Sequence, residues 1–352
     1  MVTDECNYQC VYCPQVKEKN YLTNSAIKKA IDFFSPFFAD NGYVNFYGGE
    51  PLLAFNQIKQ AISYLKQTEQ KLDRTFRYSI STNASLIDDD IMHFFDEHKF
   101  SIVLSFDGFA QNISRHQNSF DKIVETIVAL QKCSNIQLMT YSVFTPETVH
   151  LLSKSIQLLM DMLIPDIDFS VSSVLPWDEA SLDQLRNQLV AIRQYGLEFY
   201  EATNTLPVEF LRETPRSGVS RCDAGQDRMC ITPDGMLWGC PVFPNFFQGK
   251  EGTSEYKKYC FGDLDMFIAN HSRIYPEIVT NYTYLRQDFF RAPQGLCLFC
   301  PDLEDCSVCP VYVAFSSSQI GEIPLWLCQI KKVYRQEKKL FLDALHNLNV
   351  HQ

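Results

Sequence analysis

The chain has 352 residues, 46% of them hydrophobic, so it is long enough to bury one large core or a core with a smaller satellite domain. Its 31 Lys and Arg against 42 Asp and Glu give a formal net charge of -11, which disfavours a polyanion such as nucleic acid as a partner. The sequence shows no secretory signal region and no apolar run of the roughly 18 residues that a membrane helix needs, so we expect a cytoplasmic protein that does not bind a membrane.

Cysteine placement is the first strong feature of the sequence. Of the 13 cysteines, three lie in the opening stretch "DECNYQCVYCPQ", nine lie from Cys222 to Cys328, and only Cys133 lies between these groups. A secreted disulfide framework would normally sit in a much shorter chain, whereas closely spaced C-x2-C pairs are common in metal sites. The distribution therefore predicts one metal site near the start of the chain and at least one more in the tail.

The opening stretch spaces its cysteines as C-x3-C-x2-C, at Cys6, Cys10 and Cys13. Three thiolates on one short loop can hold three irons of a four-iron cluster and leave the fourth iron open to another ligand. A zinc site would need a fourth protein ligand nearby, and the first histidine along the chain is His93. Taken alone, the spacing leaves a cluster and a simpler thiol site both open.

Strands and helices alternate after the opening loop. We expect strands at 43–47, 76–82, 101–106, 136–144 and 166–174, and helices at 24–38, 55–67, 88–97, 119–132 and after 147. Such alternation predicts βαβ units around a parallel sheet. With about six strand-and-helix repeats, periodicity alone fits either a doubly wound sheet or a partial TIM-type barrel.

The alternation ends at about Asn204, where a tail rich in Pro, Gly, Cys and aromatic residues begins. Asp234-Gly235, between apolar residues, predicts a hairpin turn. We expect a small domain stabilised by metal, with a boundary between residues 205 and 206. From Gln329 the chain looks helical, and its basic stretch at 331–339 predicts a solvated helix face.

The head of the chain resembles the radical S-adenosylmethionine (SAM) enzymes, whose signature is C-x3-C-x2-C with an aromatic residue, here Tyr12, before the third cysteine. The resemblance implies a partial (β/α)6 TIM-type barrel with a 4Fe-4S cluster on the three head cysteines. It places Tyr12 toward the adenine of SAM. The SAM amino group would be bound by the "GGEP" loop, which consists of Gly48, Gly49, Glu50 and Pro51.

Two further head segments resemble the family's contacts with the ribose and carboxylate of SAM. They are "STNAS", with Asn83, and "LSFDG", with Ser105, and each follows a predicted strand. Arg115 in "ISRHQ" is a third candidate for the carboxylate, with an ordinary surface arginine as the alternative.

The tail resembles the SPASM domain, an auxiliary-cluster extension of radical SAM enzymes that modify peptides and proteins. The residues that follow its pattern are Cys222, Gly235, Cys240, Cys297, Cys300, Cys306, Cys309 and Cys328. One departure is the C-x2-C spacing of Cys306 and Cys309, where the family has three intervening residues. A zinc site is the alternative for this segment, and a non-enzymatic zinc-binding scaffold is the alternative for the whole chain.

The resemblance implies two auxiliary 4Fe-4S clusters with interleaved ligands. Cys222, Cys240 and Cys309 would hold the first cluster, and Cys297, Cys300, Cys306 and Cys328 the second. Cys230 is either the fourth ligand of the first cluster or a buried structural thiol. We expect Cys133 and Cys260 to be core residues.

The implied activity is reductive cleavage of SAM to a 5'-deoxyadenosyl radical that oxidatively modifies, and crosslinks, a residue in a ribosomally synthesised peptide. Its cofactors would be SAM and three 4Fe-4S clusters. The expected partners are a precursor peptide, an electron donor such as flavodoxin or ferredoxin, and a separate leader-binding protein. Sulfatase maturation by formylglycine formation is an alternative, although Pro241 stands where those maturases carry an aspartate, and small-molecule tailoring is another.

Overall fold

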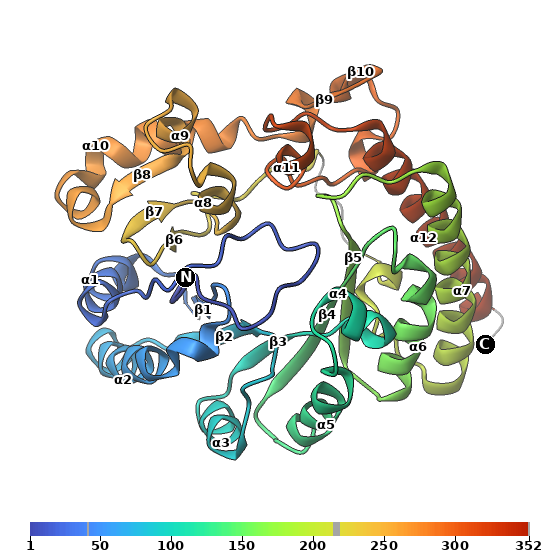
Figure 1. Cartoon of the computed structure of the whole chain (residues 1–352), viewed down its shortest axis with the longest axis horizontal. Helices are drawn as coiled ribbons and strands as arrows, with labels where there is room; N and C mark the ends of the chain where they lie inside the picture. Colours follow the sequence, from blue (N-terminus) through green and yellow to red (C-terminus); the bar gives the residue numbers. More distant parts are fainter. Residues whose placement is uncertain (41, 214–218, 351–352) are drawn as a thin grey trace.

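A five-stranded parallel sheet, in the order β1-β2-β3-β4-β5, forms the first half of the computed structural model, which describes residues 1–40, 42–213 and 219–350. The strands are β1 (Tyr43–Phe46), β2 (Arg77–Thr82), β3 (Ser101–Ser105), β4 (Gln137–Phe144) and β5 (Asp166–Val171). The helices that accompany them are α1 (Asn24–Phe34), α2 (Phe55–Leu72), α3 (Asp89–Glu97), α4 (Gln111–Ser114), α5 (Phe120–Leu130), α6 (Leu152–Asp161) and α7 (Glu179–Thr203). Figure 1 shows the helices along the convex side of a fanned sheet. The predicted α/β partial barrel is confirmed.

Burial alternates along each strand, because the helices cover one face of the sheet. In β4, Leu138 and Phe144 are buried under the helices, whereas Met139, Tyr141 and Val143 are only partly buried on the other face. Successive strand residues point to opposite faces, so every second residue of the sheet borders the concave space. The helices bury one stripe each, as α5 does with Ile123, Ile127 and Leu130.

The parallel sheet has five strands rather than the expected six, and a single-residue β-bridge flanks it at each edge. At one edge Thr3 pairs in parallel with Gly48, beyond the end of β1, and at the other Val208 pairs in parallel with Ile167 of β5. Pro207 lacks an N–H group, and the chain enters a 3-10 helix at Glu209–Leu211, so the second bridge does not extend into a strand. Within the described residues, the parallel sheet therefore ends in a single bridge at each edge.

The tail builds a three-stranded antiparallel sheet and a small hairpin. Its strands are β6 (Cys230–Ile231), β7 (Met236–Trp238), β8 (Cys260–Asp263), β9 (Arg291–Ala292) and β10 (Gly295–Leu296). Its helices are α8 (Val242–Phe247), α9 (Ser254–Tyr259), α10 (Leu264–Thr283), α11 (Ala314–Ser317) and α12 (Leu325–Val350). The predicted turn at Asp234-Gly235 is confirmed, since Gly235 has φ +85° and its N–H donates to the Thr232 carbonyl at 2.8 Å.

Helix α12 returns to the barrel and packs along α7 (Figure 1). An ion pair between Arg193 Nε and Glu337 Oε2 at 2.9 Å joins the two helices, and Glu337 is almost fully buried. The prediction of a solvated basic face at 331–339 is therefore wrong in part, because Glu337 and Val333 face inward and Lys331 is partly buried. Of the helices in the described ranges, none has the length and apolar run that crossing a membrane requires.

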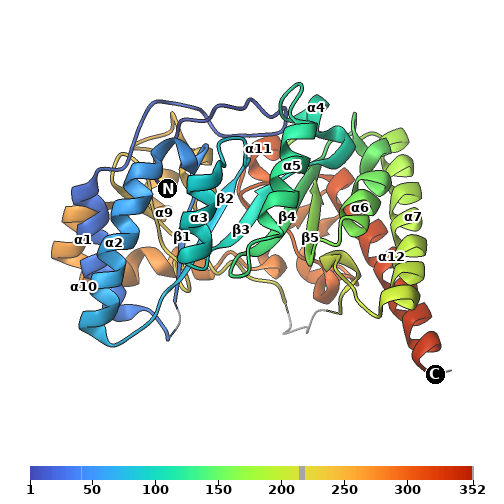
Figure 2. The same ribbon diagram turned by 90° about the horizontal axis from the view of Figure 1, so that it is seen from below.

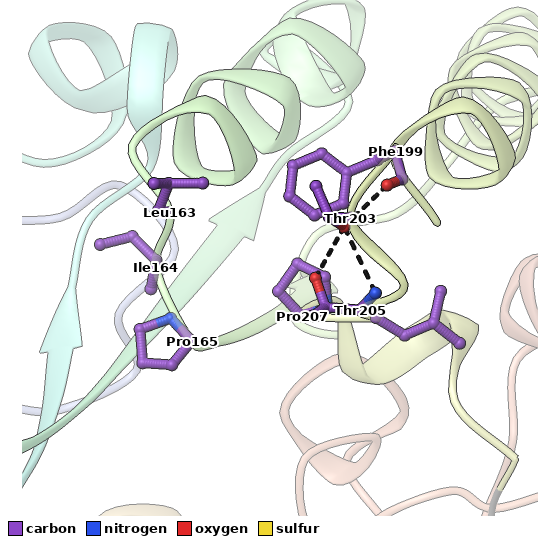
Figure 3. Close-up of a pocket in the computed structure, with 8 residues that line it drawn as sticks. Leu163, Ile164, Pro165, Phe199, Thr203, Thr205 and Pro207 are labelled. Carbon is purple, nitrogen blue, oxygen red and sulfur yellow. Dashed lines mark hydrogen bonds between the residues drawn. The ribbon is translucent and has the colours of Figure 1, made fainter. Parts of the chain in front are cut away.

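A hollow of about 400 Å³ opens at the end of the sheet where β5 begins (Figure 3). Its lining is mostly apolar and consists of Leu163, Ile164, Pro165, Phe199, Thr203, Thr205, Leu206 and Pro207. Active sites of parallel sheets are built at the opposite, carboxyl ends of the strands. The functional site is therefore expected at the carboxyl ends of β1 to β5.

Candidate active site

The loop that carries Cys6, Cys10 and Cys13 lies across the carboxyl ends of the strands (Figure 2). The Asn83 amide, just after β2, donates to Asn7 Oδ1 at 2.9 Å, and Asn7 donates to Ser85 Oγ at 2.8 Å. The Val11 N–H donates to the Ser114 carbonyl at 2.9 Å. These bonds hold the cysteine loop against segments that follow β2 and β3.

All three head thiols are partly exposed and lie near one another. Burial raises the pKa of Cys6, and it raises the pKa of Cys10 to about 11, while the neighbouring Cys13 thiol adds to both increases. The thiols of Cys6 and Cys10 are therefore protonated near neutral pH, and metal binding must displace those protons. Three thiols on one short loop are a donor set that an iron–sulfur cluster can use.

The "GGEP" loop uses its two glycines to admit the chain's own opening segment. A Cβ on Gly48 would lie 2.1 Å from the Thr3 carbonyl oxygen, and one on Gly49 would lie 2.3 Å from the Glu5 oxygen. The Gly49 N–H donates to Thr3 and the Glu50 N–H to Glu5. In the structure, the backbone of residues 3–5 therefore lies directly against these two glycines.

The carboxylate of Glu50 is 1% exposed and is held by three donors. They are the Leu52 N–H at 3.0 Å, the Thr82 hydroxyl at 2.7 Å and the Asn83 N–H at 2.8 Å. Burial raises its pKa to about 7, although all three hydrogen bonds act to lower it. Two carboxylate oxygens offer about four acceptor positions, so one further donor can be accommodated.

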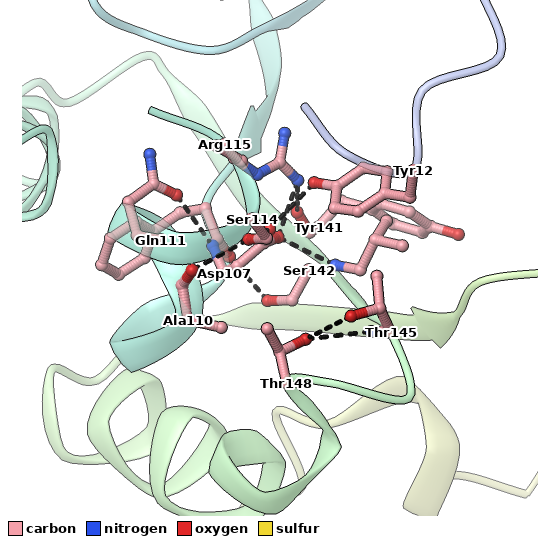
Figure 4. Close-up of polar contacts among 12 residues, drawn as sticks. Tyr12, Asp107, Ala110, Gln111, Ser114, Arg115, Tyr141, Ser142, Thr145 and Thr148 are labelled. Carbon is pink, nitrogen blue, oxygen red and sulfur yellow. Dashed lines mark hydrogen bonds and ion pairs between the residues drawn. The ribbon is translucent and has the colours of Figure 1, made fainter. Parts of the chain in front are cut away.

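Asp107, directly after β3, is the centre of a buried polar network beside the cysteine loop (Figure 4). Its carboxylate accepts from the Tyr12 hydroxyl at 2.8 Å, from Ser114, from the Val143 N–H at 2.8 Å and from Arg115 Nη2 at 2.8 Å. Burial alone would lower the pKa of Arg115, but the Asp107 charge raises it, so the guanidinium is charged.

Arg115 is not a surface residue, so that alternative is wrong. Its side chain is 6% exposed, it lies against the Tyr12 ring at 5.5 Å from the centroid, and it lowers the pKa of Cys10. Its Nε has no hydrogen-bond partner within the described part of the chain. An unpartnered N–H on a buried cation beside the head thiols fits an anionic group such as the carboxylate of SAM.

Ser105 lies in a row of residues across the sheet. Register pairs Ser105 of β3 with Tyr141 of β4, and Tyr141 with Asp168 of β5. These side chains are partly buried on the concave side, and burial raises the pKa of Asp168. A partly desolvated carboxylate that borders the concave space can accept a proton.

The tail thiols form two neighbouring groups. The pKa of Cys240 is raised to about 12 by burial and then by Cys309, Cys230 and Cys222. The pKa of Cys297 is raised to about 11 by burial and then by Cys328, Cys306 and Cys300. The loop from Cys306 to Cys309 therefore places one thiol near each group.

Three other cysteines differ in their surroundings. Cys230 lies in β6, is buried, and its thiol points to the Ile231 carbonyl at 3.8 Å while remaining close to Cys240. Cys260 is buried in β8, as predicted. Cys133 lies in the turn after α5 and is partly exposed, so its prediction as a core residue is wrong. Within the described ranges, no three His, Cys, Asp or Glu side chains converge on a single-ion site.

Partly buried tyrosines lie between the head thiols and the tail thiols. The pKa of Tyr47 is raised by burial and then by Cys13, Cys240 and Cys230, so thiols of both sets act on this residue. The pKa of Tyr312 is likewise raised by burial, with Tyr47, Tyr141 and Cys309 adding to it. Sequence reasoning missed these tyrosines and Asp107, although strand alternation marks Tyr141 and the "FDG" after β3 marks Asp107.

Known proteins resemble this chain in sequence and in fold. Residues 1–159 match the model of the Radical SAM superfamily. A curated relative, the radical SAM cyclopropyl synthase TigE of Paramaledivibacter caminithermalis, is 22% identical over 374 residues, which cover 97% of this chain and 74% of the relative.

Two solved structures share the fold. Native anSMEcpe with bound AdoMet superposes with a TM-score of 0.74 at 16% identity, covering 99% of this chain and 98% of that one. Streptococcus suis SuiB bound to the precursor peptide SuiA superposes with a TM-score of 0.58 at 17% identity, covering 92% and 73%. The likeness to these structures extends over both the barrel and the cysteine-rich tail.

Proposed function

We propose that this chain, a radical SAM enzyme whose superfamily domain occupies residues 1–159, oxidatively modifies a residue within a ribosomally synthesised peptide. The observation that carries the proposal is that Cys13 of the head and Cys240 and Cys230 of the tail all raise the pKa of the buried Tyr47 hydroxyl, so both sets of thiols lie near one residue. The likeness to TigE and to SuiB with its precursor peptide supports a peptide as the substrate.

Cys6, Cys10 and Cys13 would hold the head cluster, since their partly buried thiols lie together on one loop. A 4Fe-4S cluster bound there would supply one electron for the reductive cleavage of SAM to methionine and a 5'-deoxyadenosyl radical, and that radical would take a hydrogen atom from the substrate. Glu50 would accept from the SAM ammonium at its remaining acceptor position. Arg115 Nε would donate to the SAM carboxylate, beside the Tyr12 ring.

The tail groups would hold two auxiliary 4Fe-4S clusters. Cys222, Cys240 and Cys309 would form the first set, and Cys230, whose charge raises the pKa of Cys240, would be its fourth ligand. Cys297, Cys300, Cys306 and Cys328 form the second set. Asn83 and Ser105, at the ends of β2 and β3, would orient the ribose and carboxylate of SAM.

Iron content tests the three sites. Anaerobically reconstituted protein should carry about twelve irons per chain with matching sulfide. Replacing Cys6, Cys10 and Cys13 by Ala should remove about four irons and leave the tail irons in place. Zinc in the tail, with iron only at the head, would contradict the auxiliary clusters and favour the zinc scaffold.

Substrate identity is tested on short open reading frames encoded beside this gene. We expect one such peptide to lose a mass of about two hydrogens after incubation with the enzyme, SAM and a strong reductant, because one bond forms by radical oxidation. Fragmentation would then locate the bond. Conversion of a sulfatase Cys or Ser to an aldehyde, without change in these peptides, would favour the sulfatase alternative.

Pro241 weighs against that alternative. It caps α8 directly after Cys240, so this position offers no carboxylate to the concave space. We further propose that the enzyme works in the cytoplasm with a small electron-transfer protein, such as flavodoxin or ferredoxin, and with a separate leader-binding protein.

A further inference from the structure

Gln287 is a buried amide in contact with the second set of tail thiols. It is 2% exposed, and its backbone N–H is fixed by the Ser220 carbonyl at 2.8 Å. Its Nε2 donates to Cys306 Sγ at 3.8 Å. The same amide forms a hydrogen bond with Cys297 that acts to lower the pKa of that thiol. One side chain therefore contacts two of the four sulfurs.

The orientation of this amide is informative. Its Oε1 has no partner within the residues that the structure describes. A sulfur bound to metal carries no proton, so only the N–H end of an amide can donate to it. A buried amide that leaves its oxygen unpaired and turns its N–H groups to sulfur is arranged for thiolates rather than for thiols.

Helix α12 adds cations on the same side. Cys328, Lys331 and Arg335 are spaced three and four residues apart, so they share one helix face. Arg335 is anchored to the cysteine loop through Asp302, whose carboxylate it meets at 2.8 Å. Lys331 and Arg335 both act on Cys306 from this face, and both lower its pKa.

We propose that Gln287 is a positioning residue whose N–H groups, together with Lys331 and Arg335, bias a cluster held by Cys297, Cys300, Cys306 and Cys328 toward its reduced state. The inference rests on the proposed function, because it requires a cluster at this site. Reduction adds one negative charge, and buried N–H dipoles and cations stabilise that charge more strongly than exposed ones do. This site is therefore suited to receive an electron.

The chain offers a matched control. Gln294 Nε2 lies 3.8 Å from Cys328 Sγ, so it makes the same contact at the same distance to the same set of thiols. Gln294 is exposed, however, and water can replace its N–H when the side chain is removed. The two glutamines differ mainly in burial.

The experiment is a potentiometric titration of the reconstituted full-length holoprotein, followed by electron paramagnetic resonance. In Gln287→Leu we expect the reduction equilibrium of one tail cluster to shift about tenfold toward the oxidised state. This corresponds to a midpoint potential that is lower by about 59 mV for one electron. Gln287→Glu should lower it further, because it replaces the donor by a negative charge. Gln294→Leu should change the reduction equilibrium of the same cluster by less than about threefold.

Iron analysis separates the possible failures. A tail without iron in the unmodified protein would overturn both the proposed clusters and this inference. Full iron with an unchanged midpoint in Gln287→Leu would overturn the inference alone. If Gln287→Leu loses iron, the Lys331→Met variant is measured instead. A lowered midpoint potential in that variant supports the inference that the surrounding groups favour the reduced cluster, and an unchanged midpoint potential contradicts it.

Discussion

Asp107 accepts hydrogen bonds from four groups while its side chain is fully buried. Two of these donors come from parts of the chain that would otherwise be independent, the cysteine loop through Tyr12 and β4 through Val143. A buried carboxylate is tolerated here because Arg115 neutralises it. At the scale of single residues, this network fixes the aromatic side chain of the cysteine motif.

Replacing Asp107 by Asn should destabilise the protein by about 3–5 kcal/mol, because it leaves the Arg115 charge buried without a partner. Tyr12→Phe removes only one hydrogen bond and should cost about 1 kcal/mol. Urea denaturation of both variants measures the difference. Equal losses would show that the ion pair does not carry the stability of the network.

Glu50 should make SAM binding depend on pH. Its pKa of about 7 without ligand means that the carboxylate is mostly protonated at pH 6 and mostly ionised at pH 8. The ammonium of SAM pairs with the ionised form, so affinity should rise about tenfold over this interval. Isothermal titration calorimetry at several pH values measures it, and Glu50→Gln should bind weakly with a flat profile. A flat profile in the unmodified protein would exclude the pairing.

The sequence predicted the cysteines and Glu50 as site residues because each belongs to a short contiguous motif. The sequence did not predict that Arg115 is buried, because its burial depends on Asp107 and on the Tyr12 ring. Tyr12 lies far from Arg115 along the chain, so this contact exists only in the folded protein. The same holds for Gln287, whose contacts with Cys297 and Cys306 arise only when the tail folds.

At the scale of elements, the opening segment and the "GGEP" loop form a single unit. Thr3 bridges Gly48, and the backbone from Thr3 to Glu5 occupies the space where side chains at Gly48 and Gly49 would lie. The cysteine loop begins one residue later. The direction in which Cys6 leaves the sheet is therefore set by this contact.

Gly49→Ala should destabilise the protein by about 3 kcal/mol, because the new methyl group would press on the backbone of Asp4 and Glu5, which cannot move independently of the sheet. Gly249→Ala is the control, since nothing lies within 4 Å of its Cβ position and only its φ of +74° is strained. That variant should cost about 1 kcal/mol. Thermal unfolding compares them, and similar losses would argue against the close contact.

Elements were predictable where their pattern reflects local burial. The strands of the parallel sheet were predictable as short, mostly apolar segments between predicted helices, as β3 is at Ser101–Ser105. The buried face of α12 was not predictable in the same way. In the sequence Lys331 and Glu337 are typical of a solvent-exposed helix face, but in the fold Lys331 lies near the thiols of the tail loop and Glu337 pairs with α7. Basic residues in a helical sequence show that one helix face is charged, but they do not show which other element packs against that face.

At the scale of the whole molecule, one hydrophobic core runs from the barrel into the tail. It contains Ile167 and Val208 at the sheet edge together with Phe290, Val313 and Phe341 from the tail and α12. A second core, rich in aromatic residues such as Trp238 and Phe261, underlies β6 to β8. The boundary predicted between residues 205 and 206 stays a prediction.

We expect a fragment of residues 1–205 not to fold stably, because it lacks the side chains of α12 and of Val208 and Leu211 that complete the first core. The fragment should show weak near-ultraviolet circular dichroism and no cooperative unfolding transition, whereas the full chain should show both. A cooperative transition in the fragment would mean that the barrel core is sufficient without the tail.

The short loop from Cys306 to Cys309 gives one thiol to each tail group, and this sharing has a consequence for how the protein acquires iron. If both groups hold clusters, the first to form fixes the loop and so removes most of the conformational freedom of the second site's ligand. Loading should then be cooperative. Native mass spectrometry of a protein starved of iron should show chains with empty tails and chains with about eight tail irons, and few chains in between.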